Sequence, residues 1–145
     1  MVDAESINER LGRLEHWLEL LEEVRSGGEI AYLADERLQA ATERWLQLAE
    51  QACIDLGAHL VTEVSAPPPS DYAGIFTALA EAGYLDPNLA QRLVEVARQR
   101  NLLVHAYLDI DDRKVFESLH HLDDLRAFAV AVQRLLDADQ EGNRG

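Results

Sequence analysis

The sequence predicts an all-α protein, an up-and-down bundle of four main helices with one short extra helix. Apolar residues recur at intervals of three and four through most of the chain, which is the periodicity of a helix with one buried face. No stretch alternates apolar and polar residues long enough to form a strand. Glycine, proline and capping residues separate the periodic stretches, as expected for helices joined by short connections.

Length and composition indicate one folded domain over residues 1–145. Apolar residues make up 48% of the 145 residues and charged residues 28%, which is typical of a soluble globular protein. No stretch reaches the roughly 18 to 20 apolar residues of a membrane span, and the N-terminus is acidic, so we expect a cytoplasmic protein. The single cysteine, Cys53, excludes an internal disulfide and a zinc cluster of thiols.

The first two helices are predicted from their apolar seams. Residues 3 to about 26 form the first, which the Ser-Gly-Gly run at 26–28 ends. The second is expected from about Ala31, and more firmly from Asp35, to about Val64. Glu50 lies beside Cys53 on a mostly apolar stretch of this helix. We interpret it as a solvated acid, with an inward-pointing acid as the alternative.

Proline, glycine and capping residues set the remaining boundaries. The Pro-rich run 65–70 is a stiff connection, and Ser70 is predicted to cap a short helix over about 71–82, which Gly83 ends. Asp86 and Pro87 form the next start signal, a capping aspartate followed by proline at the first helical position. That helix is predicted to carry the functional residues.

The last predicted helix extends from about 112 to 137, with a tail at about 139–145 that we expect to be frayed.

The charge of the chain restricts where a phosphate could bind. The formal net charge is −14, which argues against a protein that grips nucleic acid over a broad basic face. Residues 88 to 108 are the exception, because they hold three arginines against one acid. A phosphate-binding site is therefore expected in this stretch, while most of the acids elsewhere serve as solvated surface.

Five polar side chains lie in this stretch on an otherwise apolar helix: Arg98, Arg100, Asn101, His105 and Tyr107. A histidine can exchange protons near neutral pH, and an arginine can hold a phosphate with two parallel hydrogen bonds, so the set suits cleavage of an RNA phosphodiester. Asn101 could orient the imidazole or the phosphate. Taken singly, each has a simpler role: surface charge for the arginines, a structural role for His105 and core packing for Tyr107.

Helical geometry predicts that the site is shared between two copies of the chain. Arg98, Asn101 and His105 fall near one line along an ideal helix, while Arg100 and Tyr107 share another, roughly a third of a turn away. Arg100 therefore does not stack on His105. A cleft completed by a second copy across a two-fold axis would bring both to one phosphate, so we expect a homodimer.

Neither a metal nor an organic cofactor is required by this chemistry. The acids that follow the stretch, Asp109, Asp111 and Asp112, are interpreted as a helix-end turn and cap rather than as metal ligands. No glycine-rich phosphate loop, Gly-x-Ser-x-Gly elbow or His-Glu-x-x-His motif is found in the sequence.

The spacing of Arg100, His105 and Tyr107 resembles the active-site signature of the HEPN superfamily. Within that superfamily the run Arg-Asn-Leu-Leu-Val-His-Ala-Tyr is most similar to the HepT family, the toxin half of HepT/MntA toxin–antitoxin pairs. The similarity extends to the start of the second helix, the Pro-rich link with its Ser-Asp-Tyr run, the Ala-Gly-Tyr-Leu-Asp turn and the Asp-Ile-Asp exit.

This resemblance implies a homodimeric, all-α, metal-independent endoribonuclease acting on RNA, with tRNA as one type of target. It implies Arg100 and His105 as catalytic residues. It also implies an MntA-like nucleotidyltransferase antitoxin that silences the toxin by attaching AMP to the signature tyrosine, here Tyr107. An attached nucleotide would place negative phosphate where the substrate phosphate binds.

Two other hypotheses remain open at this point. The first is a non-catalytic HEPN-like module that docks a nucleotidyltransferase or binds a nucleotide, with Arg100 and His105 as ligand contacts. The second is a purely structural helical bundle.

Overall fold

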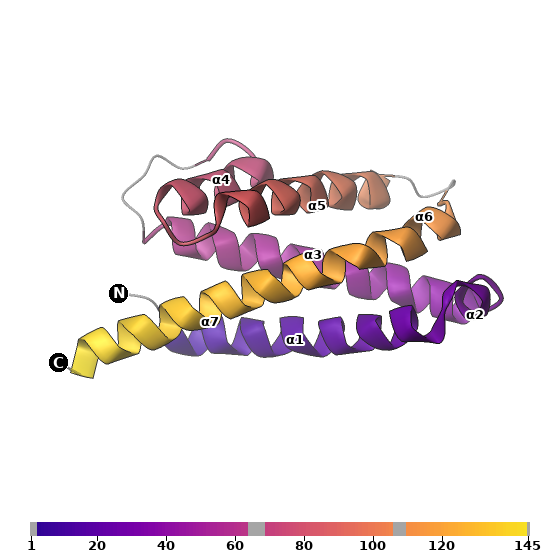
Figure 1. Cartoon of the computed structure of the whole chain (residues 1–145), viewed down its shortest axis with the longest axis horizontal. Coiled ribbons are helices and arrows are strands. Elements are labelled where there is room, and N and C mark those ends of the chain that lie inside the picture. The colour runs from indigo at the N-terminus through magenta and orange to yellow at the C-terminus, as the bar shows by residue number, and fades with distance from the viewer. Residues whose placement is uncertain (1–2, 64–68, 106–109, 145) are drawn as a thin grey trace.

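Four long helices run antiparallel to their neighbours in sequence and form the body of the molecule (Figure 1). They are α1 (Ala4–Gly27), α3 (Glu36–Val61), α5 (Pro87–His105) and α7 (Leu122–Arg144). The computed structural model describes residues 3–63, 69–105 and 110–144, and gives only the backbone for 101–105 and 143–144. Every regular element in these ranges is a helix, which confirms the predicted all-α class. More than one short helical segment accompanies the four long helices, where the sequence predicted a single one.

The connection between α1 and α3 differs from the sequence prediction. Gly28 adopts φ +90° and ends α1, and the short helix α2 (Glu29–Leu33) follows. A new helix, α3, then begins after Asp35, whose carboxylate accepts a hydrogen bond from the Leu38 N–H at 3.1 Å. The prediction of one continuous helix from about Ala31 was therefore wrong, because the aspartate cap competes with helix continuation. α3 ends at Val61, and the predicted end at Val64 lies outside the described residues.

The short helix α4 (Tyr72–Glu81) and the start of α5 follow the predicted pattern with one change. The cap of α4 is Asp71 rather than Ser70, since the Asp71 carboxylate accepts a hydrogen bond from the Gly74 N–H at 2.8 Å. Gly83 has φ +87° and allows the turn out of α4, as predicted. The carboxylate of Asp86 accepts from the Leu89 N–H at 3.2 Å, so α5 begins at Pro87 as expected.

The predicted last helix is divided in two. The helix α6 (Asp112–Glu117) is followed by a 3₁₀ segment, η1 (Ser118–His121), before α7 begins. The Ser118 hydroxyl is buried and donates a 2.6 Å hydrogen bond to the Val115 carbonyl oxygen, a local bond of the kind that bends helices. α7 continues to Arg144, so the chain is helical well into the tail that we expected to be frayed.

The core lies where the apolar faces of the four long helices meet, with α4 covering α3 and α5 (Figure 1). Phe76 of α4 and Phe128 of α7 pack edge to face with ring centroids 5.7 Å apart, and so connect the two sides of the bundle. No helix among the described residues is both long enough and apolar enough to cross a lipid bilayer.

Candidate functional site

Helix α5 carries four of the five predicted site residues. Arg98, Arg100, Asn101 and His105 all lie within its continuous span, with Asn101 and His105 located by their backbone. Tyr107 lies outside the described residues. Because the backbone stays helical to His105, the backbone positions of Arg100 and His105 lie about 140° apart around an ideal helix axis. One copy of α5 therefore does not place these two residues on the same face of the helix.

Arg98 lies on the solvent side of α5. Its guanidinium donates a 2.6 Å hydrogen bond to Glu95 one turn earlier, and both side chains are more than 60% exposed. An exposed pair of this kind contributes little stability and exchanges readily with other partners. Arg98 also lines a hollow of about 640 Å³ between α4 and α5, together with Asn88 and Arg92. It can therefore reach a substrate but is not held in one position.

Arg100 is placed more tightly, at the junction of three helices. It is partly buried, and its Nε atom is shielded from solvent. The carbon of its guanidinium lies 6.0 Å from the ring centre of Tyr72 on α4, at the outer limit of a cation–π contact. The charge of Arg100 also interacts electrostatically with the carboxyl of Glu50, which lies on α3. Helices α3, α4 and α5 pack against one another, so this arrangement is built into the fold.

Glu50 is the site residue that our sequence interpretation misplaced. We interpreted it as solvated, but its side chain is only 2% exposed, and its Oε2 atom has no hydrogen-bond partner among the described groups. The signal was present in the sequence, because the residues one turn away from Glu50 on the same face are apolar. They are Leu46, four residues before it, and Cys53 and Ile54, three and four residues after it, and all are buried in the structure. A position flanked in this way lies on the core stripe of a helix. Tyr72 was not assigned a role beforehand either.

Burial changes the acid–base chemistry of two side chains on α3. Desolvation raises the pKa of Glu50 to about 8, against the opposing effect of the nearby Arg100 charge. Burial, together with the Glu50 charge, raises the pKa of the Cys53 thiol well above its usual range. Glu50 is thus mostly protonated at neutral pH, and Cys53 is not a nucleophile there.

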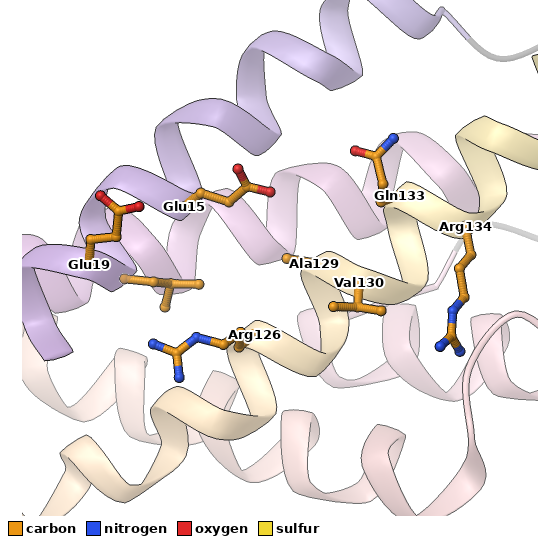
Figure 2. Close-up of a pocket in the computed structure, with 8 residues that line it drawn as sticks. Glu15, Glu19, Arg126, Ala129, Val130, Gln133 and Arg134 are labelled. Carbon is orange, nitrogen blue, oxygen red and sulfur yellow. The ribbon is translucent and has the colours of Figure 1, made fainter.

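Two surface hollows elsewhere contain none of the predicted site residues. One, of about 390 Å³, lies between α1 and α7, and Figure 2 shows acids of α1 and arginines of α7 around it. Its lining is Glu15, Leu18, Glu19, Arg126, Ala129, Val130, Gln133 and Arg134. Another, of about 620 Å³, lies between the connection from α4 to α5 and the helix α7. We place the candidate site at Arg100 rather than at either hollow, because neither hollow is lined by a histidine, the side chain that exchanges protons most readily near neutral pH.

In the described part of the chain, no group of three or more histidine, cysteine, aspartate or glutamate side chains is arranged to hold a metal ion. The acids after α5 have a structural role where they are described. Asp111 caps α6 by accepting a 3.1 Å hydrogen bond from the Arg113 N–H, and Asp112 begins the helix. Asp109 lies outside the described residues.

Sequence comparison relates most of the chain to known nucleases. A family model described as "Ribonuclease HepT-like" matches residues 14–132. The tRNA nuclease HepT of Aphanizomenon flos-aquae is 32% identical over 113 residues, which cover 78% of this chain and 77% of that protein. The mRNA nuclease HepT of Shewanella oneidensis is 29% identical over 100 residues, covering 68% and 75% respectively.

Solved structures share the fold. A tri-AMPylated Shewanella oneidensis HEPN toxin, in complex with an MNT antitoxin, aligns with a TM-score of 0.80 at 24% identity over 92% of this chain and 99% of that one. YutE of Bacillus subtilis, a cytosolic protein of unknown function, aligns with a TM-score of 0.82 at 22% identity over 95% of this chain and 93% of its own. The sequence matches confirm the resemblance noted from the signature. Since the family model spans more than half of the chain, this protein belongs to the ribonuclease HepT-like family.

Proposed function

We propose that this protein is a metal-independent endoribonuclease that acts in the cytoplasm as the toxin of a toxin–antitoxin pair. The observation that carries the proposal is the position of Arg100, held between α3 and α4 on the helix that also contains His105. Two relatives of this chain are named tRNA nuclease and mRNA nuclease, and this supports the proposed activity. The substrate class is therefore RNA, with tRNA and mRNA as the two candidates.

The chemistry assigned to these residues needs only a proton carrier and a cation. The imidazole of His105 takes the proton of the ribose 2′-hydroxyl, and the 2′-oxygen attacks the adjacent phosphorus. The bond to the 5′-oxygen breaks, and that oxygen takes a proton from an imidazolium, which leaves a 2′,3′-cyclic phosphate and a 5′-hydroxyl. Arg100 stabilises the phosphoryl charge in the transition state, while Asn101 and Arg98 orient the substrate.

We further propose that the active form is a homodimer in which two copies of α5 face a common cleft. The angular separation of Arg100 and His105 on one helix supports this arrangement. A two-fold axis beside α5 would set the Arg100 of one copy near the His105 of its partner, so that each phosphate meets both groups.

The proposed partner is an MntA-like nucleotidyltransferase antitoxin that attaches AMP to Tyr107. A related toxin carries AMP in complex with its MNT antitoxin, which supports this assignment. Co-expression with such a partner is expected to add one or more AMP masses to the protein, and the Tyr107→Phe variant is expected to lose the addition. Intact-mass spectrometry measures the added mass. An unchanged mass of the wild-type protein after co-expression would contradict the proposal that the partner attaches AMP to Tyr107.

The nuclease proposal is tested with purified protein and RNA in the presence of EDTA. Wild type is expected to cleave, and His105→Ala or Arg100→Ala is expected to lower kcat by at least about 100-fold, since each removes a proton carrier or a phosphate ligand. Arg44→Ala removes an exposed arginine on α3 and serves as the matched control, with activity near wild type. Helical content by circular dichroism should stay the same in all variants.

The alternative is a non-catalytic module that binds the nucleotidyltransferase or a nucleotide. It predicts no cleavage by wild type under any condition, together with weaker partner or nucleotide binding in Arg100→Ala. The partly buried setting of Arg100 is compatible with an anion-binding role alone, so the cleavage assay separates the two hypotheses.

A further inference from the structure

Glu50 has an ionisable side chain, yet it is buried in the core without a described hydrogen-bond partner for its Oε2 atom. Its side chain is only 2% exposed, and the residues one turn away on its own helix, Leu46 and Cys53, are buried as well. An ionised carboxylate is very costly to bury without a partner. An apolar residue would fill this part of α3 at a lower free energy. The acid is thus unexplained by packing.

Arg100 is the charged side chain that interacts electrostatically with Glu50. The charge of Arg100 acts on the Glu50 carboxyl across the contact between α5 and α3, and Tyr72 approaches the guanidinium from α4. The guanidinium therefore lies near an acid of α3 and an aromatic ring of α4. A substrate phosphate must engage the same guanidinium and so competes with Glu50 for its charge.

We propose that Glu50 is a positioning residue for Arg100, an internal counter-ion that releases the guanidinium to the substrate phosphate when protonated and retains it when ionised. This inference rests on the proposed function of Arg100 as the phosphate ligand. It adds to that function a proton-linked control of RNA affinity, located on a helix that lacks the signature. Glu50 itself need not touch the RNA.

The proposed competition fixes the direction of the pH effect. With the pKa of Glu50 raised to about 8 by burial, the acid is protonated at pH 7 and Arg100 is available to phosphate. Above pH 8 the carboxylate forms and opposes phosphate binding, so RNA affinity falls as pH rises.

Few other groups act on Glu50. Arg100 of α5 is the charged side chain that affects its pKa, and within the described residues none from α1, α4 or α7 does so. Cys53, one turn along α3, is its titratable neighbour, and the pKa of that thiol is raised beyond the range of the experiment.

The test uses a 2′-O-methylated RNA oligonucleotide, which binds without being cleaved. Its Kd for the full-length protein is measured by fluorescence anisotropy from pH 7 to pH 9. Wild type should lose up to about tenfold in affinity across this range, because one proton is linked to binding. Glu50→Gln keeps the shape but has no charge to gain, so its Kd should stay flat. Parallel curves for the two proteins overturn the proposal.

A matched control comes from the same helix. Glu43 lies two turns earlier on α3, is partly buried where Glu50 is fully buried, and also has a raised pKa, through desolvation and then the charge of Asp112. Because Glu43 is coupled to α6 rather than to Arg100, Glu43→Gln should reproduce the pH dependence of wild type. If the Kd of Glu43→Gln also stayed constant with pH, removal of either acid of α3 would abolish the pH dependence. That result would overturn the proposal that Glu50 is its source.

A second measurement separates this inference from the nuclease proposal. Carbon-13 NMR of the glutamate carboxyls, with the Glu50 signal assigned by its absence from Glu50→Gln, should show its pKa rising in Arg100→Gln, since an attractive charge is lost. An unchanged pKa overturns the inference even if RNA is cleaved. A raised pKa in a protein that cleaves no RNA upholds the Glu50–Arg100 coupling and rejects only the nuclease function.

Discussion

The buried carboxyl of Glu50 should make the stability of the protein depend on pH. Burial raises the pKa of Glu50 to about 8 in the folded state, whereas an unfolded chain has a glutamate pKa of about 4.3. Between these values the folded state holds a proton that the unfolded state has lost. Its contribution to stability is complete below about pH 4 and is lost as pH rises to about 8.

The Glu50→Gln variant isolates this contribution. Its free energy of unfolding should equal or fall below that of wild type near pH 5 and exceed it progressively up to pH 8, with a difference that grows by at most about 1.4 kcal/mol per pH unit. Urea unfolding of both proteins at pH 5, 6, 7 and 8 provides the measurement. A constant difference across the series would mean that Glu50 titrates normally in the folded protein.

At the scale of the elements, α4 matters because it carries Tyr72 to Arg100, and its distance from α3 is set by a glycine. A Cβ atom added at Gly57 of α3 would lie 2.7 Å from Cγ2 of Ile75 on α4. That methyl group is attached directly to a branched Cβ and cannot swing aside freely. The close approach of these two helices therefore requires glycine at this position.

Gly57→Ala is expected to destabilise the protein by about 1 to 3 kcal/mol through overpacking, in spite of the higher helix propensity of alanine. Gly12→Ala makes the same chemical change on α1, where nothing lies within 4 Å of the added Cβ, and should stabilise by about 0.5 to 1 kcal/mol. Denaturant unfolding of the two variants should give opposite signs. Stabilisation by both would show that α4 can move away from α3 at no cost.

At the scale of the whole molecule, the proposed dimer makes each site depend on two copies of the chain. The continuous α5 helix keeps Arg100 and His105 on different sides of one axis. If each phosphate is held by the Arg100 of one copy and the His105 of its partner, an Arg100→Ala chain paired with a His105→Ala chain keeps one complete site and loses the other.

Mixed dimers of these two inactive variants should therefore recover up to about half of the wild-type activity per dimer, because one of the two related sites is intact. Co-purification through two different affinity tags supplies the mixed dimer, and light scattering checks its mass. Mixed dimers as inactive as either parent would place both groups in one copy, and a monomeric mass in active protein would remove the dimer from the mechanism.

The sequence by itself determined the helical class, the four long helices and the signature on α5, because these depend on local features. Apolar spacing of three and four predicts a helix wherever it occurs, and an aspartate cap or a glycine ends it through hydrogen bonds to its own neighbours. The predicted starts at Asp35 and Pro87 were correct for this reason. The local errors were of the same kind: Ser70 and Asp71 are adjacent capping residues, and sequence alone ranks them almost equally.

Only the tertiary structure decided the surroundings of Arg100. Whether Glu50 faces solvent or the core depends on which flank of α3 is covered by α5, and the proximity of Tyr72 depends on how closely α4 approaches across Gly57. These contacts join residues far apart in the chain, so no local periodicity encodes them. The pKa of Glu50 follows from the same packing, because removal of water by neighbouring helices, rather than the glutamate itself, sets its charge at neutral pH.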